Sequence, residues 1–494
     1  MPPTGSQAYP GPSTEEVENG LAAGLRGTKL AGHWWKTGFY RQVLWWAGLL
    51  AILLLGHFSW GVALALLPWG VFAFWFVARQ GYKPWVGWSL ALAGLLAVQC
   101  WIETPPSVWQ HDVDGHREYI DYLSVEDKLP VVKQGWETFQ PPLYYAIAAV
   151  WRWAWSGIPQ DDPFRSVQVL AAALYVSTIA LSLVAYRRLG LNDIEAVGAT
   201  GILVLMPGYV FFAARINNDV LLPLLGVGVM LLTARFVENG ERRVLVGLSL
   251  LLAATLATKG SSLAMVGGAL ALVLWAECQL SDWRAALLRV YLTGLPAGLW
   301  LIFWCMRAAD EAGNPFYVNA NLPESLRIHA SLWERMLSFK FGAFLGGNFY
   351  YDAPMRHSYF TALVTSCLYD EYGMGSYAFR CPELLRWGCL GLILILFAGA
   401  VLPPRRELRS VWITCLCLAL CQTAITVAYA VEYPFACNQN MRFFAQAFAP
   451  LAGLFGLGVG RLWTVADWYS RLVLLLIMVV FLMGVADFYA RVLF

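Results

Sequence analysis

The chain has 494 residues, of which 59% are hydrophobic and only 13% charged, and its mean hydropathy is +0.55. A soluble domain of this composition would expose large apolar patches to water, so the composition excludes a soluble globular protein and favours an integral membrane protein. The net charge of +2, without basic runs or phosphate-loop motifs, gives no support to nucleic-acid binding.

The start of the chain differs from the rest. Residues 1–30 are rich in Pro, Gly and Ser and lack the apolar core of a signal peptide. We therefore expect residues 1–40 to form a disordered cytoplasmic tail and residues 41–494 to form one polytopic membrane domain.

Apolar runs long enough to span a membrane recur along that domain. About thirteen are present, at roughly 42–57, 60–78, 85–102, 167–186, 196–213, 219–236, 243–258, 262–277, 288–306, 384–402, 410–430, 441–459 and 469–490. The sequence thus predicts an all-α membrane protein with about thirteen transmembrane helices.

Basic residues occupy alternate short turns between these runs. They are Arg79 with Lys83, Arg187 with Arg188, Arg242 with Arg243, Arg284 with Arg289, and Arg405 with Arg406 and Arg409. By the positive-inside rule, these turns are cytoplasmic. Two long loops, about 103–166 and 307–383, then lie outside and are expected to carry interfacial helices, because both are rich in Trp, Tyr and Phe.

The first outer loop holds the segment "HDVDGHREYIDYL", which concentrates acidic residues and histidines. In one interpretation, Asp114 caps a helix and the other charges are solvated. In a second, Asp112 or Asp114 is a general base whose pKa is raised at an apolar boundary. In a third, His111, Asp112, Asp114 and His116 bind a divalent metal ion.

The segment "WETFQPPLYYAIAAVWRWAW" follows in the same loop. Its two prolines suit the first turn of a helix, and the Tyr and Trp residues after them, including Tyr144 and Tyr145, suit a membrane interface. Glu137 is a second acid just before this bend, where it could orient an acceptor or bind a ligand cation.

Isolated polar and cationic residues stand at outer helix ends further along the chain. Asn218 or Asp219 in "RINNDVLL" is a candidate helix N-cap, and Arg215 beside them offers a permanent cation. Lys259 in "TLATKGSSLAM" either snorkels to the interface or binds a lipid phosphate. Arg442 in "CNQNMRFFAQAFAP" is another candidate phosphate ligand.

The motifs "DVDGHREYIDYL", "QPPLYYAIAA", "RINNDVLL", "ATKGSSL" and "MRFFAQAFAPLAGLFGLG" occur in this order within about residues 85–460. In this order the chain resembles the phospholipid-carrier-dependent glycosyltransferases of the GT-C superfamily, and is similar to protein O-mannosyltransferases and lipid A aminoarabinose transferases. The resemblance implies a GT-C membrane fold, an active site on the outer face and a polyprenyl-phosphate-linked sugar donor.

The resemblance also implies roles for single residues. Asp112 matches the catalytic base of the first outer loop, with Asp114 as the competing choice, and Glu137 matches the second acidic position. Lys259 matches a Lys near the lipid phosphate, and Arg442 matches the late Arg of the family.

The chain departs from the family at two places. Many relatives have an adjacent Asp-Glu pair in the first loop, whereas Val113 follows Asp112 here. Gln140 stands before the two prolines, where relatives often have His or Lys.

The predicted activity is therefore inverting transfer of a sugar to an acceptor hydroxyl on a lipid, protein or glycan, on the periplasmic face of a bacterial inner membrane. We expect the donor phosphate to bind Arg215, Lys259 and Arg442, and the substrates to contact His116, Tyr144, Tyr145, Asn218 and Asp219. No cofactor is required, because the cations alone can balance a leaving phosphate, although a divalent metal is left open. The alternative is a transporter or flippase for a polyprenyl-linked lipid or related anion.

Overall fold

The computed structural model describes residues 60–107, 112–317, 324–346, 357–369, 383–465 and 468–492. The chain divides into two units, residues 1–72 and 73–494. Of the first unit, only the start of α2 (Trp60–Arg79) falls among the described residues. The predicted tail and the predicted span at 42–57 lie outside the described residues, whereas α2 forms at the predicted span 60–78.

The described part of the chain is all-α, and its residues form no strand beyond one isolated bridge between Arg327 and Phe435. Nine of its helical segments are long and apolar enough to cross a membrane. Their helices are α3 (Gly87–Glu103), α6 (Arg165–Arg188), α9 (Leu222–Asn239), α11 (Leu263–Leu280), α12 (Trp283–Ala312), α17 (Glu383–Val401), α18 (Arg409–Glu432), α19 (Phe448–Val465) and α20 (Trp468–Val492). Each overlaps a predicted span, so the prediction of an all-α, multi-pass membrane protein is confirmed.

Two other predicted spans take a different form. At 196–213, α7 (Asp193–Leu205) is followed by α8 (Pro207–Val210) and η2 (Phe211–Ala214), with a bend of 69° between them. The bend falls at Met206, which is extended because the ring of the next residue, Pro207, disfavours the helical conformation before it.

The predicted span at 243–258 is α10 (Val244–Thr258), which has only 15 residues. Such a helix is about 22 Å long, shorter than the roughly 30 Å hydrocarbon core of a bilayer. The predicted count of about thirteen is therefore not confirmed: the described residues contain nine full spans, or ten if the bent pair is counted as one.

Short 3-10 helices connect or extend several of these segments. They are η1 (Pro84–Val86), η3 (Asn218–Val220), η4 (Gly260–Ser262), η5 (Glu324–Leu326), η6 (Arg406–Leu408), η7 (Ala436–Gln439) and η8 (Met441–Ala447). Three of them, η3, η4 and η8, lie where the predicted cationic and polar motifs stand, so these motifs are on irregular backbone at helix ends.

Helices of the second unit pack closely where glycines face a neighbouring backbone. In α9, a Cβ added to Gly226 would lie 2.0 Å from the carbonyl oxygen of Gln446, and one added to Gly399 of α17 would lie 1.9 Å from that of Leu454 in α19. No side chain fits at such distances, so glycine is required for these helix crossings. The crossing at Gly226 holds α9 against the η8 segment, which carries Arg442.

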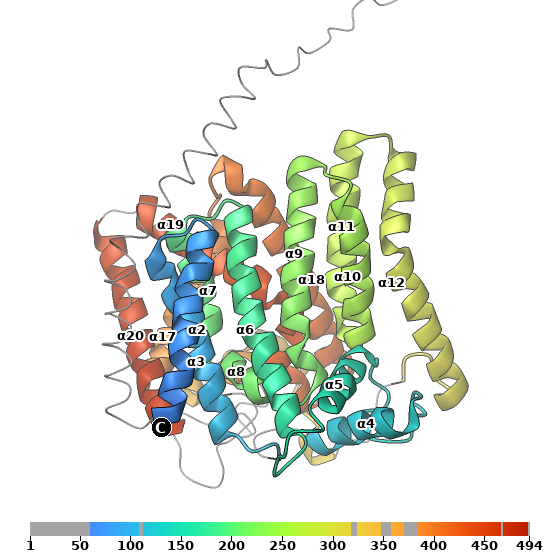
Figure 1. Cartoon of the computed structure of the whole chain (residues 1–494). Helices are drawn as coiled ribbons and strands as arrows, with labels where there is room; N and C mark the ends of the chain where they lie inside the picture. Colours follow the sequence, from blue (N-terminus) through green and yellow to red (C-terminus); the bar gives the residue numbers. More distant parts are fainter. Residues whose placement is uncertain are drawn as a thin grey trace, which may run out of the picture. The chain divides into compact units, whose positions relative to one another are not determined.

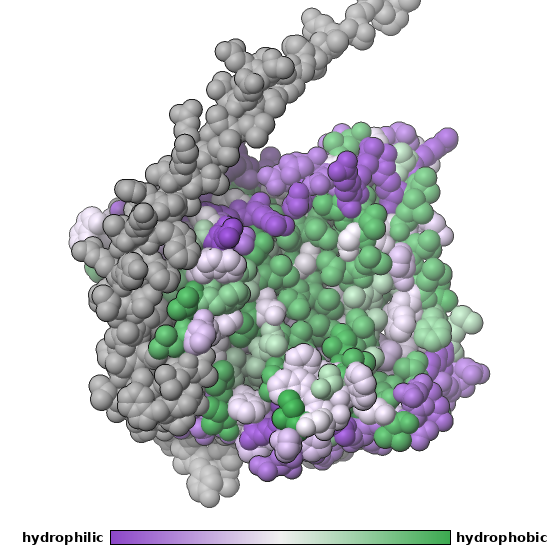
Figure 2. All heavy atoms as spheres, viewed as in Figure 1, coloured by the Kyte–Doolittle hydropathy of each residue, from purple (hydrophilic) through white to green (hydrophobic). Residues whose placement is uncertain are grey.

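The long helices of the second unit expose an apolar surface between two polar ends. Figure 1 shows α6, α9, α10, α11 and α12 standing alongside one another. Over α6, α9, α10 and α12, Figure 2 shows a hydrophobic band between two hydrophilic rims. Such a band is what a lipid bilayer covers.

One end of the second unit carries additional short helices. In the two predicted outer loops the described residues form α4 (Val113–Glu126), α5 (Leu143–Ala154), α13 (Leu332–Leu337), α14 (Phe341–Leu345) and α16 (Tyr359–Tyr369). Figure 1 shows α4 and α5 at the end of the bundle where α9 begins and α10 stops, with α4 lying across the direction of the long helices. The basic turns α9–α10 and α11–α12 lie at the opposite end.

Candidate functional site

Asp112 stands immediately before α4 in an unusual backbone conformation. Its φ is +55°, in the left-handed region, which Asp tolerates better than most residues with a side chain. The Oδ1 atom accepts a 2.8 Å hydrogen bond from Nε1 of Trp136, and Oδ2 lies 3.8 Å from Nη1 of Arg442. The Asp112 side chain does not cap α4 and is directed toward Trp136 and Arg442 instead.

Glu137 is buried directly beneath α4, with only 6% of its surface exposed. Gly115 of α4 permits this contact, because an added Cβ would lie 3.0 Å from Cγ of Glu137 and 3.1 Å from Cβ of Trp136. Burial, and secondly the negative charge of Asp112, raise the pKa of Glu137 to about 8, although two nearby cations oppose the shift. Glu137 is therefore mainly protonated at neutral pH, and Asp112 is the more exposed of the two acids.

An aromatic layer joins α4 to α5. Nδ1 of His116 and the hydroxyl of Tyr145 share a 2.8 Å hydrogen bond, and Tyr119 stacks on Tyr145 with ring centroids 4.1 Å apart. Burial lowers the pKa of His116 to about 3, so its imidazole is neutral at physiological pH. Tyr144 packs edge-on against Tyr145. The predicted substrate residues His116, Tyr144 and Tyr145 are all buried in this layer.

Lys259 forms a buried ion pair with Asp219. Its Nζ lies 2.6 Å from Oδ1 of Asp219, and the two residues are 8% and 1% exposed. Asn218 donates a 3.0 Å hydrogen bond to the carbonyl oxygen of Thr258, which holds η3 against the end of α10. The contact of Asn218 with the side-chain oxygen of Gln140 is longer, at 3.4 Å.

These contacts correct three predictions. Neither Asn218 nor Asp219 caps a helix with its side chain, because each is engaged across the gap to α10. Lys259 does not snorkel to the interface, because its ammonium group is buried on Asp219. Asp114 does not cap α4 either: it lies exposed in the first turn, and Asp112 occupies the position before the helix without a capping hydrogen bond from its side chain.

Lys259 and Arg442 meet at one aromatic ring. Nζ of Lys259 lies 5.2 Å from the centroid of Phe443, and the guanidinium carbon of Arg442 lies 5.5 Å from it. Asn440 fixes the start of η8 by accepting a 2.8 Å hydrogen bond from the backbone N–H of Arg442. The two cations come from segments far apart in the sequence and contact the same ring, while each also lies near a carboxylate, that of Asp219 or of Asp112.

Arg215, the third predicted cation, stands at the end of the bent α7–η2 segment. It is 4% exposed, and its guanidinium carbon lies 5.2 Å from the ring centroid of Phe212. Its stacking partner is therefore a different ring from the one that Lys259 and Arg442 share.

Asp112, Asp114 and His116, the described members of the predicted metal site, do not form a group of ligands. No three His, Cys, Asp or Glu side chains there are placed to hold a metal ion. Nδ1 of His116 is bonded to Tyr145 and Asp114 is exposed, which leaves Asp112 as the described candidate ligand, while His111 lies outside the described residues. The metal hypothesis stays a prediction, and no step of the proposed reaction depends on it.

Two residues of the site were missed by sequence reasoning. Trp136 donates the hydrogen bond that orients Asp112, and Phe443 is the ring shared by the two cations. Each directly adjoins a predicted site residue, Glu137 or Arg442, and that adjacency is the signal that could have found them. An aromatic residue in an aromatic-rich chain carries little information by itself.

No family model matches the chain, and no curated protein matches it. Among solved structures, it is similar to the archaeal oligosaccharyltransferase AglB from Archaeoglobus fulgidus, determined in complex with an inhibitory peptide and a dolichol-phosphate. The two chains are 12% identical with a TM-score of 0.44, over 82% of this chain and 56% of that one. The chain thus spans little more than half the length of AglB, and a likeness at this score defines neither the fold nor the reaction.

Proposed function

We propose that this protein is an inverting glycosyltransferase of the GT-C type, which transfers a sugar from a polyprenyl-phosphate-linked donor to an acceptor hydroxyl. The observation that carries the proposal is the position of the Asp112 carboxylate, 3.8 Å from Arg442, which shares the Phe443 ring with Lys259. A base next to a pair of cations suits a reaction in which a hydroxyl loses a proton and a phosphate leaves.

Asp112 is the proposed base. The acceptor hydroxyl gives its proton to the Asp112 carboxylate while its oxygen forms a bond to the anomeric carbon. The bond from that carbon to the phosphate oxygen breaks, and the configuration inverts. Support comes from the hydrogen bond of Trp136, which orients Asp112, and from the exposure of Asp114, which points to a solvated role for the latter.

Glu137 has a different role in this proposal. Because it holds its own proton at neutral pH, it is a poor base there. A protonated carboxyl group can donate a hydrogen bond to a sugar hydroxyl or to the Asp112 carboxylate. Its burial under α4 makes it a positioning residue for Asp112.

The cations act on the leaving group. Negative charge grows on the phosphate as the glycosidic bond breaks, and Lys259 and Arg442 are placed to stabilise it, with Arg215 as a third contributor. Removal of one such contact typically costs on the order of 10²-fold in rate. In this scheme Lys259 exchanges part of its interaction with Asp219 for the donor phosphate.

The membrane setting suits a lipid-linked donor. The proposed site lies at the end of the bundle opposite the basic turns, which the positive-inside rule assigns to the cytoplasm. We therefore propose that the reaction takes place on the extracytoplasmic face of a bacterial inner membrane, with the polyprenyl chain among the spanning helices.

The test compares Asp112→Asn with Asp114→Asn in purified protein supplied with polyprenyl-phosphate-linked sugars and lipid, protein or glycan acceptors. Asp112→Asn is expected to lower transfer by about 10²- to 10⁴-fold, the usual contribution of a general base, while Asp114→Asn retains most activity. Full activity of Asp112→Asn would exclude this mechanism. Movement of the lipid across vesicles without any sugar transfer would support the flippase alternative instead.

Mass spectrometry of the lipids that co-purify with the protein tests the donor class separately. A polyprenyl phosphate, with or without its sugar, is expected to be retained by the unmodified protein. Its loss from a Lys259→Met variant would link retention to the proposed phosphate site.

A further inference from the structure

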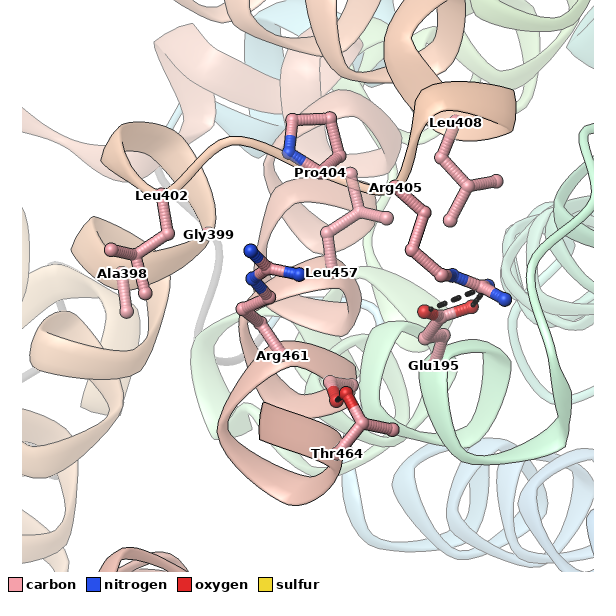
Figure 3. A pocket seen from close by; sticks show the side chains of 11 residues that line it. Glu195, Ala398, Gly399, Leu402, Pro404, Arg405, Leu408, Leu457, Arg461 and Thr464 are labelled. Carbon is pink, nitrogen blue, oxygen red and sulfur yellow. Dashed lines mark hydrogen bonds and ion pairs between the residues drawn. The ribbon is translucent and has the colours of Figure 1, made fainter. Parts of the chain in front are cut away.

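A second charged site lies at the basic end of the bundle, away from the proposed active site. A small pocket, open to solvent, is formed where α7, α17 and α19 meet the α17–α18 turn. Figure 3 shows its lining, which consists of Glu195, Ala398, Gly399, Leu402, Pro404, Arg405, Leu408, Leu457, Gly460, Arg461 and Thr464. The proposed reaction uses none of these residues.

One arginine of the pocket is already satisfied. Nη2 of Arg405 lies 2.9 Å and 3.1 Å from the two carboxylate oxygens of Glu195, and Nη1 lies 3.4 Å from Glu407. Glu195 also completes the capping box of α7 with Asn192. These charges are balanced within the protein and serve to hold the α17–α18 turn against α7.

Arg461 of α19 is the other arginine of the pocket. In the part of the chain that the structure describes, neither a hydrogen bond nor an ion pair engages its guanidinium group. Figure 3 shows it pointing into the pocket beside Leu457, separate from the Glu195–Arg405 pair. Arg405 is thus neutralised by two carboxylates, whereas no carboxylate among the described residues pairs with Arg461.

The walls around Arg461 suit a lipid. Ala398, Leu402 and Leu457 provide an apolar side, and α17 ends close by at Val401, where the spanning segment stops. The backbones of α17 and α19 are locked together there, since a Cβ on Gly458 would lie 2.3 Å from the carbonyl oxygen of Ile395. The pocket therefore lies at a membrane boundary and is held rigid by this helix crossing.

We propose that this pocket binds the phosphate group of an anionic glycerophospholipid, with Arg461 as its charge partner and the apolar wall against the first methylenes of the lipid. Anionic lipids are enriched in the cytoplasmic leaflet, where the basic turns place this end of the protein. A guanidinium group is suited to phosphate because it can donate two parallel hydrogen bonds. The proposal is independent of the proposed transferase activity.

The experiment uses the full-length protein in nanodiscs of phosphatidylcholine, with increasing fractions of phosphatidylglycerol. The melting temperature and the lipids retained in native mass spectrometry are measured. Phosphatidylglycerol is expected to raise the melting temperature of the unmodified protein and to be retained. Arg461→Gln is expected to bind it about tenfold more weakly, the usual effect of losing a hydrogen bond to a charged group.

Two further variants serve as controls. Arg471→Gln removes an exposed arginine of α20 near the same end and should behave as the unmodified protein, while Arg461→Lys, which keeps the charge, should retain part of the binding. Equal lipid binding by Arg461→Gln and the unmodified protein would overturn the assignment. So would equal stabilisation by inorganic phosphate alone, with no further gain from the lipid.

Discussion

Asp112 and Glu137 are both acidic residues of the same loop, but their surroundings differ. Glu137 is buried against Gly115, where the charged form loses its hydration, whereas Asp112 reaches Trp136 and Arg442 and is partly exposed. Where two neighbouring acids have different surroundings, one commonly acts as an acid and the other as a base. The left-handed backbone of Asp112 fits this picture, because such conformations are frequent at functional sites.

Glu137 is expected to make folding stability depend on pH. Its pKa rises from the ordinary 4.5 to about 8 on folding, so between these pH values the folded state holds a proton that the unfolded state has lost. The free energy of unfolding therefore falls as pH rises through this window, and the full penalty is present above pH 8.

Glu137→Gln removes this dependence. The melting temperature of the variant minus that of the unmodified protein should increase steadily from about pH 5 to about pH 8. Above about pH 8 this difference should stay constant. Thermal unfolding in detergent at several pH values provides the measurement. If the melting temperatures of the two proteins changed in parallel with pH across this range, Glu137 would not be buried as described.

At the scale of elements, the proposed site is assembled from helix ends. η3, η4 and η8 bring Asp219, Lys259 and Arg442 from three distant segments. Each of these segments breaks its helix beside the site, and irregular backbone inside a membrane protein is tolerated where it is buried or lines a polar cavity. The Lys259–Asp219 ion pair links two of these breaks.

A double-mutant cycle tests that link. Lys259→Met and Asp219→Leu should each lower the free energy of unfolding by about 3–5 kcal/mol, because each leaves a buried charge without its partner. The double variant should recover most of that loss, since two apolar side chains replace the pair. Additive losses in the double variant would mean that the two charges act separately.

At the scale of the whole molecule, charge distinguishes the two ends of the second unit. Arg187, Arg242, Arg289 and Arg405 are each engaged with a carboxylate at the basic end, while the proposed site with Asp112 occupies the other. Figure 2 shows a polar rim at each end, and by the positive-inside rule we propose that the rim with the basic turns is cytoplasmic.

Cysteine labelling in oriented vesicles tests this orientation. Cys278, at the basic end of α11, is exposed, and Val125 of α4 is 77% exposed at the other end. A membrane-impermeant maleimide should label Cys278 only from the cytoplasmic side. It should label Val125→Cys, made in a Cys278→Ser background, only from the outer side. The reverse pattern would place the proposed site in the cytoplasm.

The sequence by itself determined the class of protein and the positions of most spanning helices, and it supplied the charged residues of the candidate site. Hydrophobic length and Arg placement are local properties, so they can be read without knowing the fold. The order of the motifs was enough to suggest a lipid-dependent glycosyltransferase. Asp112, Glu137, Lys259 and Arg442 were first named from their residue types and positions in the chain, and the resemblance then gave them roles.

Only the tertiary structure decided how these residues pair. Asp219 was a candidate helix cap, and the fold places Lys259 2.6 Å from it. Asp112 was the preferred base with Asp114 as the competing choice, and only the fold shows that Asp112 contacts Trp136 and lies near Arg442 while Asp114 is exposed. The bend at Met206 and the shared ring of Phe443 likewise depend on contacts between distant segments. The physical reason is that burial and charge pairing depend on distances through space, which local sequence patterns do not encode.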